Sequence, residues 1–284
     1  MGTFVTLKLQ TKDKHYFTPA FKILQDVTDS LSSYDTNSTI YKLNTFKKVK
    51  ADFYAYDALS LAKEYYRVTD GYFDVAIGSI TKDLYHFGED AQVPTQEALS
   101  NSRIALSGLS LSREELTIEE GIKIDLGGIG KGYGVDRVAE YLKHHNVLNA
   151  TIALSGDIRC LGVCTIEINN PFSTAPLAVL KSTKEEMAFS TSGNYNRYVR
   201  SSKHNHLINP KTKTSQQNFI SITLIGSVPN SDLDAYATAV SVMPKERAYT
   251  FLASQNLAYI ILEQGGREVV SENIELFVNY TKKE

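Results

Sequence analysis

The segment DLGGIGKGYGVD, residues 125–136, constrains the fold of this chain more than any other segment. Its five glycines within ten residues let the backbone reach positive φ and approach a ligand closely, and Lys131 brings a positive charge to the same place. Residues 121–126 predict a strand before the loop, and the apolar residues at 135, 138, 141 and 142 predict a helix after it. A strand, a glycine turn and a helix in this order aim backbone N–H groups and a helix N-terminus at one ligand, typically a phosphate.

The loop departs from both common phosphate-binding motifs. A P-loop requires glycine where Asp125 stands and serine or threonine where Gly132 stands. A dinucleotide fingerprint requires glycine where Tyr133 stands. We therefore predict a phosphate site of another kind at this loop.

The composition predicts an ordinary globular protein. At 284 residues and 42% hydrophobic, the chain is long enough for one large domain, residues 1–284, built as two intimately joined lobes. Its 30 basic and 32 acidic residues give a formal net charge of -2, which argues against nucleic acid as a partner. The N-terminal residues alternate like a strand and lack the pattern of an export signal, and no apolar run is long enough for a membrane span.

Helical and strand patterns are interspersed without the even rhythm of a doubly wound sheet. Periodic apolar residues predict helices over 17–31 and 55–66, the second ending at residues 69–71, and a short helix is expected within the polar connection 88–103. We therefore predict an α+β fold with mixed, largely antiparallel sheets flanked by helices. Strands are expected from residue 104 onward and at 151–161, 177–181, 219–225 and 258–262, with a further helix from about Ser231.

Cys160 and Cys164 form a single C-x-x-x-C motif inside a predicted strand. Because no second cysteine pair and no neighbouring histidine accompany them, we interpret them as structural thiols rather than zinc ligands. Two cysteines do not indicate a compartment.

Asp234 and Thr238 are one turn apart on the last predicted helix, so a carboxylate and a hydroxyl share one face among small alanines. Hard oxygen ligands of this kind suit Mg²⁺, which leaves other positions to water and phosphate oxygens. The alternative is structural: Asp232 caps the helix and Asp234 favours its positive end.

Residues 190–195, STSGNY, predict a tight polar turn whose N–H and O–H groups could hold a phosphate or a ribose. His206 lies just before the Asn209-Pro210 turn and could act as a base near neutral pH, with His204 as the weaker candidate. The alternative for either histidine is a packed or surface side chain.

Aromatic residues stand beside an acid at residues 72–78, YFDVAIG, and Tyr34 lies upstream near another acid. Such rings could sandwich a flat heterocycle. The alternative is that they are core aromatics at a junction between a helix and a strand.

Together these segments resemble the ApbE family, the FAD:protein FMN transferases, almost from end to end. The matching motifs are M-G-T at Met1, S-x-x-x-x-L-N at 38–44, G-x-F-D at 71–74, D-L-G-G-I-x-K-G-Y-x-x-D at 125–136, T-S-G-x-Y at 191–195, H-x-I-D-P at 206–210 and D-A-x-x-T-A at 234–239.

The resemblance implies a protein that binds FAD with Mg²⁺, moves the FMN half onto a threonine or serine hydroxyl of another protein and releases AMP. It implies that Asp234, Thr238 and the main-chain carbonyl of Gly128 are metal ligands and that His206 takes part in catalysis. The FAD site would be lined by Met1, Tyr34, Tyr72, Phe73, Asp74, Asp125, Lys131 and the main chain of Ile208.

The chain departs from the family pattern at four places. The usual G-G-D is SGD at 155–157, the aspartate of H-x-I-D-P is Asn209, the usual T-G after the proline is absent from 211–214, and the alanine before the loop lysine is Gly130. These differences bear on the shape of the pocket and on the choice of acceptor.

The same phosphate site would serve two other functions. One is a Mg²⁺-dependent FAD pyrophosphatase that yields free FMN and AMP, and the other is a flavin-binding carrier without turnover. The resemblance also implies an acceptor that is a flavoprotein subunit of a membrane redox complex or a secreted flavin-bearing reductase. It implies the periplasmic or cell-envelope face of the bacterial inner membrane if an export signal was removed, and the cytoplasm otherwise.

Overall fold

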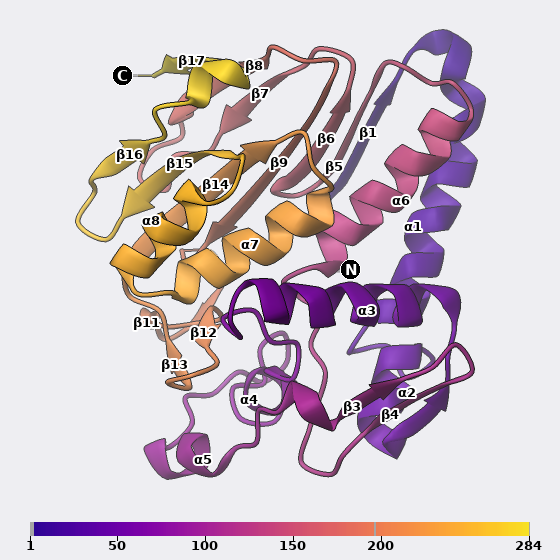
Figure 1. Ribbon diagram of the computed structural model, residues 1–284, viewed down its shortest axis with the longest axis vertical. Coiled ribbons are helices and arrows are strands. Elements are labelled where there is room, and N and C mark those ends of the chain that lie inside the picture. The colour runs from indigo at the N-terminus through magenta and orange to yellow at the C-terminus, as the bar shows by residue number, and fades with distance from the viewer. Residues whose placement is uncertain (1–2, 196, 284) are drawn as a thin grey trace.

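The computed structural model describes residues 3–195 and 197–283 and has a mixed α+β fold (Figure 1). A seven-stranded sheet in the order β1-β5-β6-β9-β14-β15-β16 dominates it, and its ladders are antiparallel. The predicted class is therefore confirmed. The strands are β1 (Val5–Leu9), β5 (Ala150–Leu154), β6 (Asp157–Leu161), β9 (Glu186–Gly193), β14 (Phe219–Gly226), β15 (Ala258–Glu263) and β16 (Glu268–Val270).

Helices α6 (Gly130–His144) and α7 (Asn230–Val242) lie across one face of this sheet, with α1 (Phe17–Leu31) beside α6 and α8 (Lys245–Ala253) following α7 (Figure 1). Helix α7 buries small side chains, including Ala235, Ala237 and Ala239, each with no exposed surface. Small residues let a helix approach the strands closely, so α7 can hold polar side chains against the edge of the core.

A three-stranded sheet in the order β17-β8-β7 packs against the large sheet through a separate apolar cluster that includes Phe189 and Ile225. Cys160, near the end of β6, forms a disulfide with Cys164, which directly precedes β7. The two cysteines are thus bonded to each other rather than free thiols. The strands of the smaller sheet are β7 (Thr165–Ile168), β8 (Ala178–Ser182) and β17 (Val278–Lys282).

The remaining elements gather below α7 in Figure 1, around α3 (Phe53–Val68) and a small sheet in the order β2-β4-β3. One apolar cluster runs through both parts, because Leu59 of α3 belongs to the same cluster as Leu224 of β14 and Val240 of α7. The other elements here are α2 (Thr39–Phe46), α4 (Gly78–Thr81), α5 (Gln96–Asn101), β2 (Lys48–Lys50), β3 (Leu109–Leu111) and β4 (Glu115–Ile118), with a single turn of 3-10 helix at η2 (Leu106–Gly108). Two further 3-10 helices lie elsewhere: η1 (Thr11–Tyr16) leads into α1, and η3 (Ile274–Leu276) shortly precedes β17. Two short hairpins, β10 (Tyr198–Val199) with β11 (Ser201–Asn205) and β12 (Ile208–Asn209) with β13 (Thr214–Ser215), complete the list.

The predicted helices at 17–31 and 55–66 are confirmed as α1 and α3. The side chain of Asp52 caps α3 by accepting from the N–H of Ala55 over 3.0 Å, and Asp70 and Gly71 take positive φ just beyond its end. Helices α2 and α8 were not predicted from the sequence. Ser38 caps α2 by accepting from the N–H of Tyr41 over 3.1 Å.

Three predicted segments differ from the structure. Residues 151–161 are a hairpin of β5 and β6, which turns at Ser155 and Gly156. Residues 190–193 lie within strand β9 and are not a turn: all four pair with β14, and Ser190 also pairs with β6. Residues 121–126 make only a single bridge, between Lys123 and Ile77, because the side chain of Asn44 bonds both the N–H and the carbonyl of Ile124.

Within residues 3–195 and 197–283, no helix has the length and apolar character needed to cross a bilayer.

Candidate active site

The ammonium of Lys131 lies between two buried carboxylates. Its Nζ is 2.6 Å from Oδ2 of Asp157 and 3.1 Å from Oδ1 of Asp234, whose side chains are 0% and 3% exposed. These ion pairs join the glycine loop to β6 and to α7. Burial alone would lower the pKa of Lys131, but the charges of Asp157 and Asp234 outweigh burial and raise it. Lys131 is therefore charged at neutral pH.

Strand β9 gives Asp157 a second contact. The hydroxyl of Ser190 donates to Oδ1 of Asp157 over 2.6 Å. Burial and the charge of Asp234 raise the pKa of Asp157, and the ammonium of Lys131 opposes that rise. Ser190, the first residue of STSGNY, thus belongs to this cluster as a strand residue and not as part of a turn.

Gly132 and Asp136 set the approach of α6 to α7. A Cβ on Gly132 would lie 2.4 Å from the carbonyl oxygen of Asn230, so this approach requires glycine. The N–H of Gly132 donates to Oδ2 of Asp234 over 3.1 Å. The Asp136 carboxylate accepts from the N–H groups of Asn230 and Ser231, over 2.7 and 2.8 Å, and so caps α7 from another helix.

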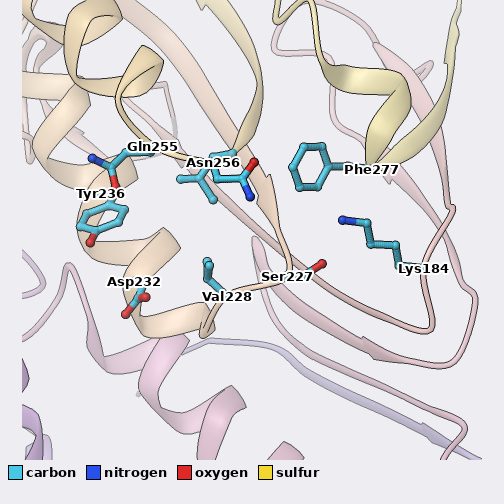
Figure 2. A pocket seen from close by; sticks show the side chains of 9 residues that line it. Lys184, Ser227, Val228, Asp232, Tyr236, Gln255, Asn256 and Phe277 are labelled. Atoms are coloured by element: carbon cyan, nitrogen blue, oxygen red, sulfur yellow. The ribbon is translucent and has the colours of Figure 1, made fainter.

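Asp232 does not cap α7, contrary to the alternative considered from the sequence. Its Oδ1 accepts from the hydroxyl of Tyr65 over 2.6 Å. Asp232 and Tyr236 line a separate pocket of about 190 Å³, and Figure 2 shows them on the helix side with Lys184 and Phe277 opposite. Residues two apart on a helix point in nearly opposite directions, so this pocket lies on the other side of α7 from Asp234.

Asp234 and Thr238 lie one turn apart on α7, as predicted, and the glycine loop lies against them. A Cβ on Gly128 would be 2.9 Å from Oγ1 of Thr238, which places the loop backbone beside that hydroxyl. Across the described ranges, no group of three or more His, Cys, Asp or Glu side chains could hold a metal ion. A cation bound here would therefore depend on one carboxylate, one hydroxyl and main-chain oxygen.

Asp125, at the start of the glycine loop, has three positive or donating neighbours. Oδ2 accepts from Oγ1 of Thr81 over 2.6 Å and lies 3.7 Å from Nζ of Lys82, and Oδ1 accepts from the N–H of Gly127 over 2.9 Å. Burial would raise the pKa of Asp125, but Lys82 and the hydrogen bonds lower it overall. Nζ of Lys82 also lies 3.7 Å from the centroid of the Tyr34 ring, which places Tyr34 at the Asp125 end of the loop.

Arg197 connects Tyr34 with His206. Nη2 of Arg197 donates to the hydroxyl oxygen of Tyr34 over 2.9 Å, and the Tyr34 hydroxyl donates to the carbonyl of Phe87 over 2.7 Å. The carbonyl oxygen of Arg197 lies 3.0 Å from Nδ1 of His206. Because a carbonyl only accepts, this geometry assigns the proton to Nδ1 and leaves the lone pair on Nε2.

His206 is half-buried beside Phe87, whose ring meets the imidazole edge-on at a centroid distance of 6.5 Å. Burial, together with the positive charges of Arg197 and Lys131, lowers the pKa of His206 to about 4, against the opposing effects of the hydrogen bond to the Arg197 carbonyl and of Asp125. The imidazole is therefore neutral at physiological pH.

The aromatic residues at 72 and 73 have different environments. Phe73 is 3% exposed and packs edge-on against Tyr65 at a centroid distance of 5.8 Å, as a core aromatic does. The ring of Tyr72 instead lies under two cations, with Nζ of Lys211 4.4 Å and the guanidinium carbon of Arg247 5.3 Å from its centroid. Tyr72 is thus the partly exposed ring of this pair, and it is in contact with two cations.

Asp74 lines a surface pocket of about 420 Å³ together with Tyr66, Gly71 and Lys211. Its Oδ1 accepts from the N–H of Ala76 over 2.8 Å. Burial raises the pKa of Asp74 to about 6. At pH values near 6 such a carboxyl is partly protonated and can donate as well as accept a hydrogen bond.

Two departures from the family pattern have structural consequences. Nδ2 of Asn209 donates to the carbonyl of Val242 over 2.7 Å, a bond that an ionised aspartate could not make, while its Oδ1 accepts from the N–H of Lys211 over 2.8 Å. Ser155 has a φ of 55°, in the left-handed region that favours glycine.

Ile208, whose main chain the resemblance assigns to the FAD site, pairs with Ser215 in the β12–β13 hairpin.

Of the residues predicted for the site, Asp125, Lys131, Asp234 and Thr238 are brought together by the glycine loop and α7, and Tyr34 and His206 are linked to the Asp125 end of that loop. Tyr72 and Asp74 border the neighbouring pocket. Met1 lies outside the residues that the structure describes.

The comparisons with known proteins identify the family of this chain. A family model described as the ApbE family matches residues 1–261. The chain belongs to the ApbE family. This ApbE chain is 28% identical over 286 residues to the FAD:protein FMN transferase of Vibrio cholerae, a match that covers 91% of this chain and 83% of that protein. It is 25% identical over 285 residues to the FAD:protein FMN transferase of Klebsiella pneumoniae, covering 95% and 89%.

Two crystal structures of ApbE proteins have the same fold as this chain. The ApbE protein of Thermotoga maritima superimposes with a TM-score of 0.87 at 24% identity, covering 98% of this chain and 96% of that one. The flavin transferase ApbE of Vibrio cholerae gives a TM-score of 0.82 at 24% identity with the same coverage. These matches establish the ApbE fold for the whole described chain.

Sequence reasoning missed several neighbours of this ApbE site. Lys82 and Arg197 stand in no motif, and they reach Tyr34 and Asp125 only through tertiary folding. Asp157 was noted as part of a departing motif but not as a partner of Lys131. Its place directly after the Ser155-Gly156 turn, opposite a serine-rich strand, is the signal that could have identified it.

Proposed function

We propose that this ApbE protein transfers the FMN half of FAD through a phosphoester bond to a threonine or serine hydroxyl of a second protein and releases AMP. The relatives support the reaction class. The observation that supports it for this chain is a charged Lys131 on the glycine loop and a His206 that is linked to the Asp125 end of that loop through Arg197, Tyr34 and Lys82. A reacting pyrophosphate needs positive charge, and an acceptor hydroxyl needs a base, so the two residues meet both needs.

In the proposed reaction, Nε2 of His206 takes the proton of the acceptor hydroxyl. The hydroxyl oxygen bonds to the phosphorus on the FMN side, the bond from that phosphorus to the bridging oxygen breaks, and AMP leaves with that oxygen. Lys131 stabilises the charge that builds on the phosphate oxygens. The hydrogen bond from Nδ1 to the carbonyl of Arg197 holds the imidazole in the tautomer that this step requires.

The residues present fit a magnesium ion. The carboxylate of Asp234, the hydroxyl of Thr238 and the carbonyl of Gly128 are hard oxygen donors of the kind that Mg²⁺ prefers, and they leave positions for phosphate oxygens. When bound, the ion would supply further charge neutralisation at the pyrophosphate. Lys131 and the ion would then share Asp234, with Asp157 as the remaining partner of the lysine.

Incubation with FAD and Mg²⁺, with and without a threonine-bearing flavoprotein acceptor, tests the proposal. We expect AMP to form only with acceptor and in step with covalent flavin on it, and EDTA to stop both. AMP and free FMN in equal amounts without acceptor would identify a pyrophosphatase instead, and bound intact FAD with no AMP would identify a carrier.

A pair of histidine variants tests the assignment of the base. His206→Ala is expected to lower the rate of transfer by about 10²- to 10⁴-fold, the usual contribution of a positioned base. His144→Ala, which alters an exposed histidine at the end of α6, serves as the matched control and should retain the rate. Asp234→Ala should in turn abolish Mg²⁺-dependent turnover. Equal activity of the two histidine variants would remove His206 from the mechanism.

We also propose that the protein acts in an oxidising compartment, such as the periplasmic or cell-envelope face of a bacterial inner membrane, on a flavoprotein acceptor there. The disulfide between Cys160 and Cys164 supports this, because such bonds are rare in a reducing cytosol. Thiol alkylation and mass spectrometry of the protein from its native host should find both cysteines unmodified. Alkylation of both would contradict the proposal.

A further inference from the structure

The hairpin of β10 and β11 leads directly into His206. Tyr198 pairs with Asn205 at its base, and Arg200 forms its tip with a φ of 60°. The N–H and Nδ1 of His206 both lie at hydrogen-bond distance from the carbonyl of Arg197, 3.2 and 3.0 Å away. Any chain that brings a hydroxyl to Nε2 of His206 must therefore pass close to this hairpin.

The hairpin belongs to a stretch of sequence with only positive charge. Residues 187–231 contain no aspartate or glutamate but carry five lysines and arginines, in a chain whose formal net charge is -2. Three of these cations bind other parts of the same chain. Arg197 donates to Tyr34, Lys211 pairs with Asp70, and Lys213 donates to the carbonyls of residues 100 and 102.

The other two cations are Arg200 and Lys203. Both are exposed, and within the described part of the chain neither forms an ion pair. Tyr198 beside them is 50% exposed, whereas Val199 is buried in the cluster that contains Phe87. The hairpin is thus anchored by one apolar residue and presents an aromatic ring and two free cations next to the proposed base.

We propose that this hairpin is the docking surface for the acceptor protein and that it recognises an acidic stretch flanking the acceptor hydroxyl. The inference rests on the proposed function, which requires a polypeptide at His206. Charge complementarity favours an acidic segment, because the free cations of the hairpin have no acidic neighbour within residues 187–231. Exposed charges at the rim of a contact act mainly on the encounter between the partners, so they should affect acceptor binding more than chemistry.

The test uses a fluorescently labelled peptide with one threonine flanked by aspartates, and a matched peptide with asparagines in their place. Binding is followed by fluorescence anisotropy without FAD or Mg²⁺, so it does not depend on turnover. We expect the aspartate peptide to bind more tightly and Arg200→Glu/Lys203→Glu to weaken its binding by about tenfold, with a smaller loss for the neutral Arg200→Gln/Lys203→Gln. The control Lys12→Glu/Lys14→Glu, which reverses two exposed charges of η1, should bind as the parent does.

Two further measurements separate this proposal from its alternatives. With FAD and Mg²⁺ present, the hairpin variants should raise the KM for the acceptor and leave the Kd for FAD unchanged. Equal binding of the two peptides, or a loss of FAD affinity in the hairpin variants, would overturn the proposal. So would hairpin-dependent sedimentation with phosphatidylglycerol vesicles without peptide binding, which would assign the surface to a membrane. Absence of flavin transfer despite hairpin-dependent peptide binding would refute the proposed function alone.

Discussion

The Nζ of Lys131 lies 2.6 Å from the buried Oδ2 of Asp157, and this contact fixes the glycine loop to the first residue of β6. The same ammonium also lies 3.1 Å from Oδ1 of Asp234 on α7. Three elements far apart in the sequence therefore meet at one positive charge. The two carboxylates hold Lys131 in place, and they also limit how much of its charge remains for a substrate.

Replacement of Lys131 should lower the free energy of unfolding, because two buried carboxylates lose their counter-ion. Lys131→Met is expected to lower the free energy of unfolding by about 3–5 kcal/mol in EDTA at pH 8, because it leaves Asp157 and Asp234 without their counter-ion. Adding Asp157→Asn should restore part of the loss, since one of the two charges is then absent. Urea unfolding of the single and double variants measures both values. A loss below about 1 kcal/mol, typical of an exposed pair, would contradict this account.

Two neighbouring glycines should respond in opposite ways to alanine. A Cβ on Gly128 would lie 2.9 Å from Oγ1 and 3.0 Å from Cγ2 of Thr238, so Gly128→Ala should cost about 1–3 kcal/mol of stability and weaken Mg²⁺-dependent FAD binding. A Cβ on Gly130 has no heavy atom within 4 Å, and Gly130→Ala should stabilise the protein by up to about 1 kcal/mol. Thermal unfolding and titration with FAD test both variants. Destabilisation by Gly130→Ala would contradict the open space around Gly130 at the start of α6.

The low pKa of His206 predicts its response to pH. Because the folded-state pKa of about 4 lies below the unfolded value near 6.5, the unfolded chain binds more protons between these values. The contribution of His206 to stability is therefore complete above pH 6.5 and is lost as the pH falls toward 4. A ¹⁵N NMR titration of the imidazole should show a neutral ring at pH 6. The transfer rate should not fall through protonation of His206 until the pH drops below about 5. An imidazole midpoint near 6.5 would contradict the burial of this side chain.

Asn209 offers a test of a family departure. Asn209→Asp restores the family's usual residue but places a carboxylate oxygen against the carbonyl of Val242, which now accepts from Nδ2 over 2.7 Å. The loss of this bond should cost about 1–3 kcal/mol at pH 7, whereas Asn279→Asp, at an exposed position of β17, should cost little. Urea unfolding of both variants measures the difference. Equal stability of both would show that the bond to the end of α7 is not needed.

The sequence predicted those parts of the fold whose signal is local. The periodicity of α1 and α3, the stop at Asp70 and the shared face of Asp234 and Thr238 all follow from spacing along one helix. The ApbE resemblance added the order of the motifs. The separation of the 151–161 segment into two strands had a local cue as well, in Ser155 and Gly156, but a continuous apolar pattern obscured it.

The parts that were missed depend on partners far away in the chain. Residues 121–126 do not become a strand because Asn44, 80 residues earlier, bonds the backbone of Ile124. The N-terminus of α7 is capped by Asp136 of another helix, so Asp232 is left to accept from Tyr65. A polar segment such as 190–193 can be a strand when a distant strand supplies its partners, here β14 along all four residues and β6 at Ser190 alone.

Intact-mass spectrometry of an acceptor tests the central claim most directly. A flavoprotein acceptor is incubated with this protein, FAD and Mg²⁺, beside an acceptor whose target threonine is replaced by alanine. We predict that the threonine acceptor gains the mass of one FMN joined with loss of water, that AMP appears in equal amount, and that the alanine acceptor is unchanged. An unmodified threonine acceptor in the presence of released AMP, or an acceptor that carries AMP instead of FMN, would contradict the account.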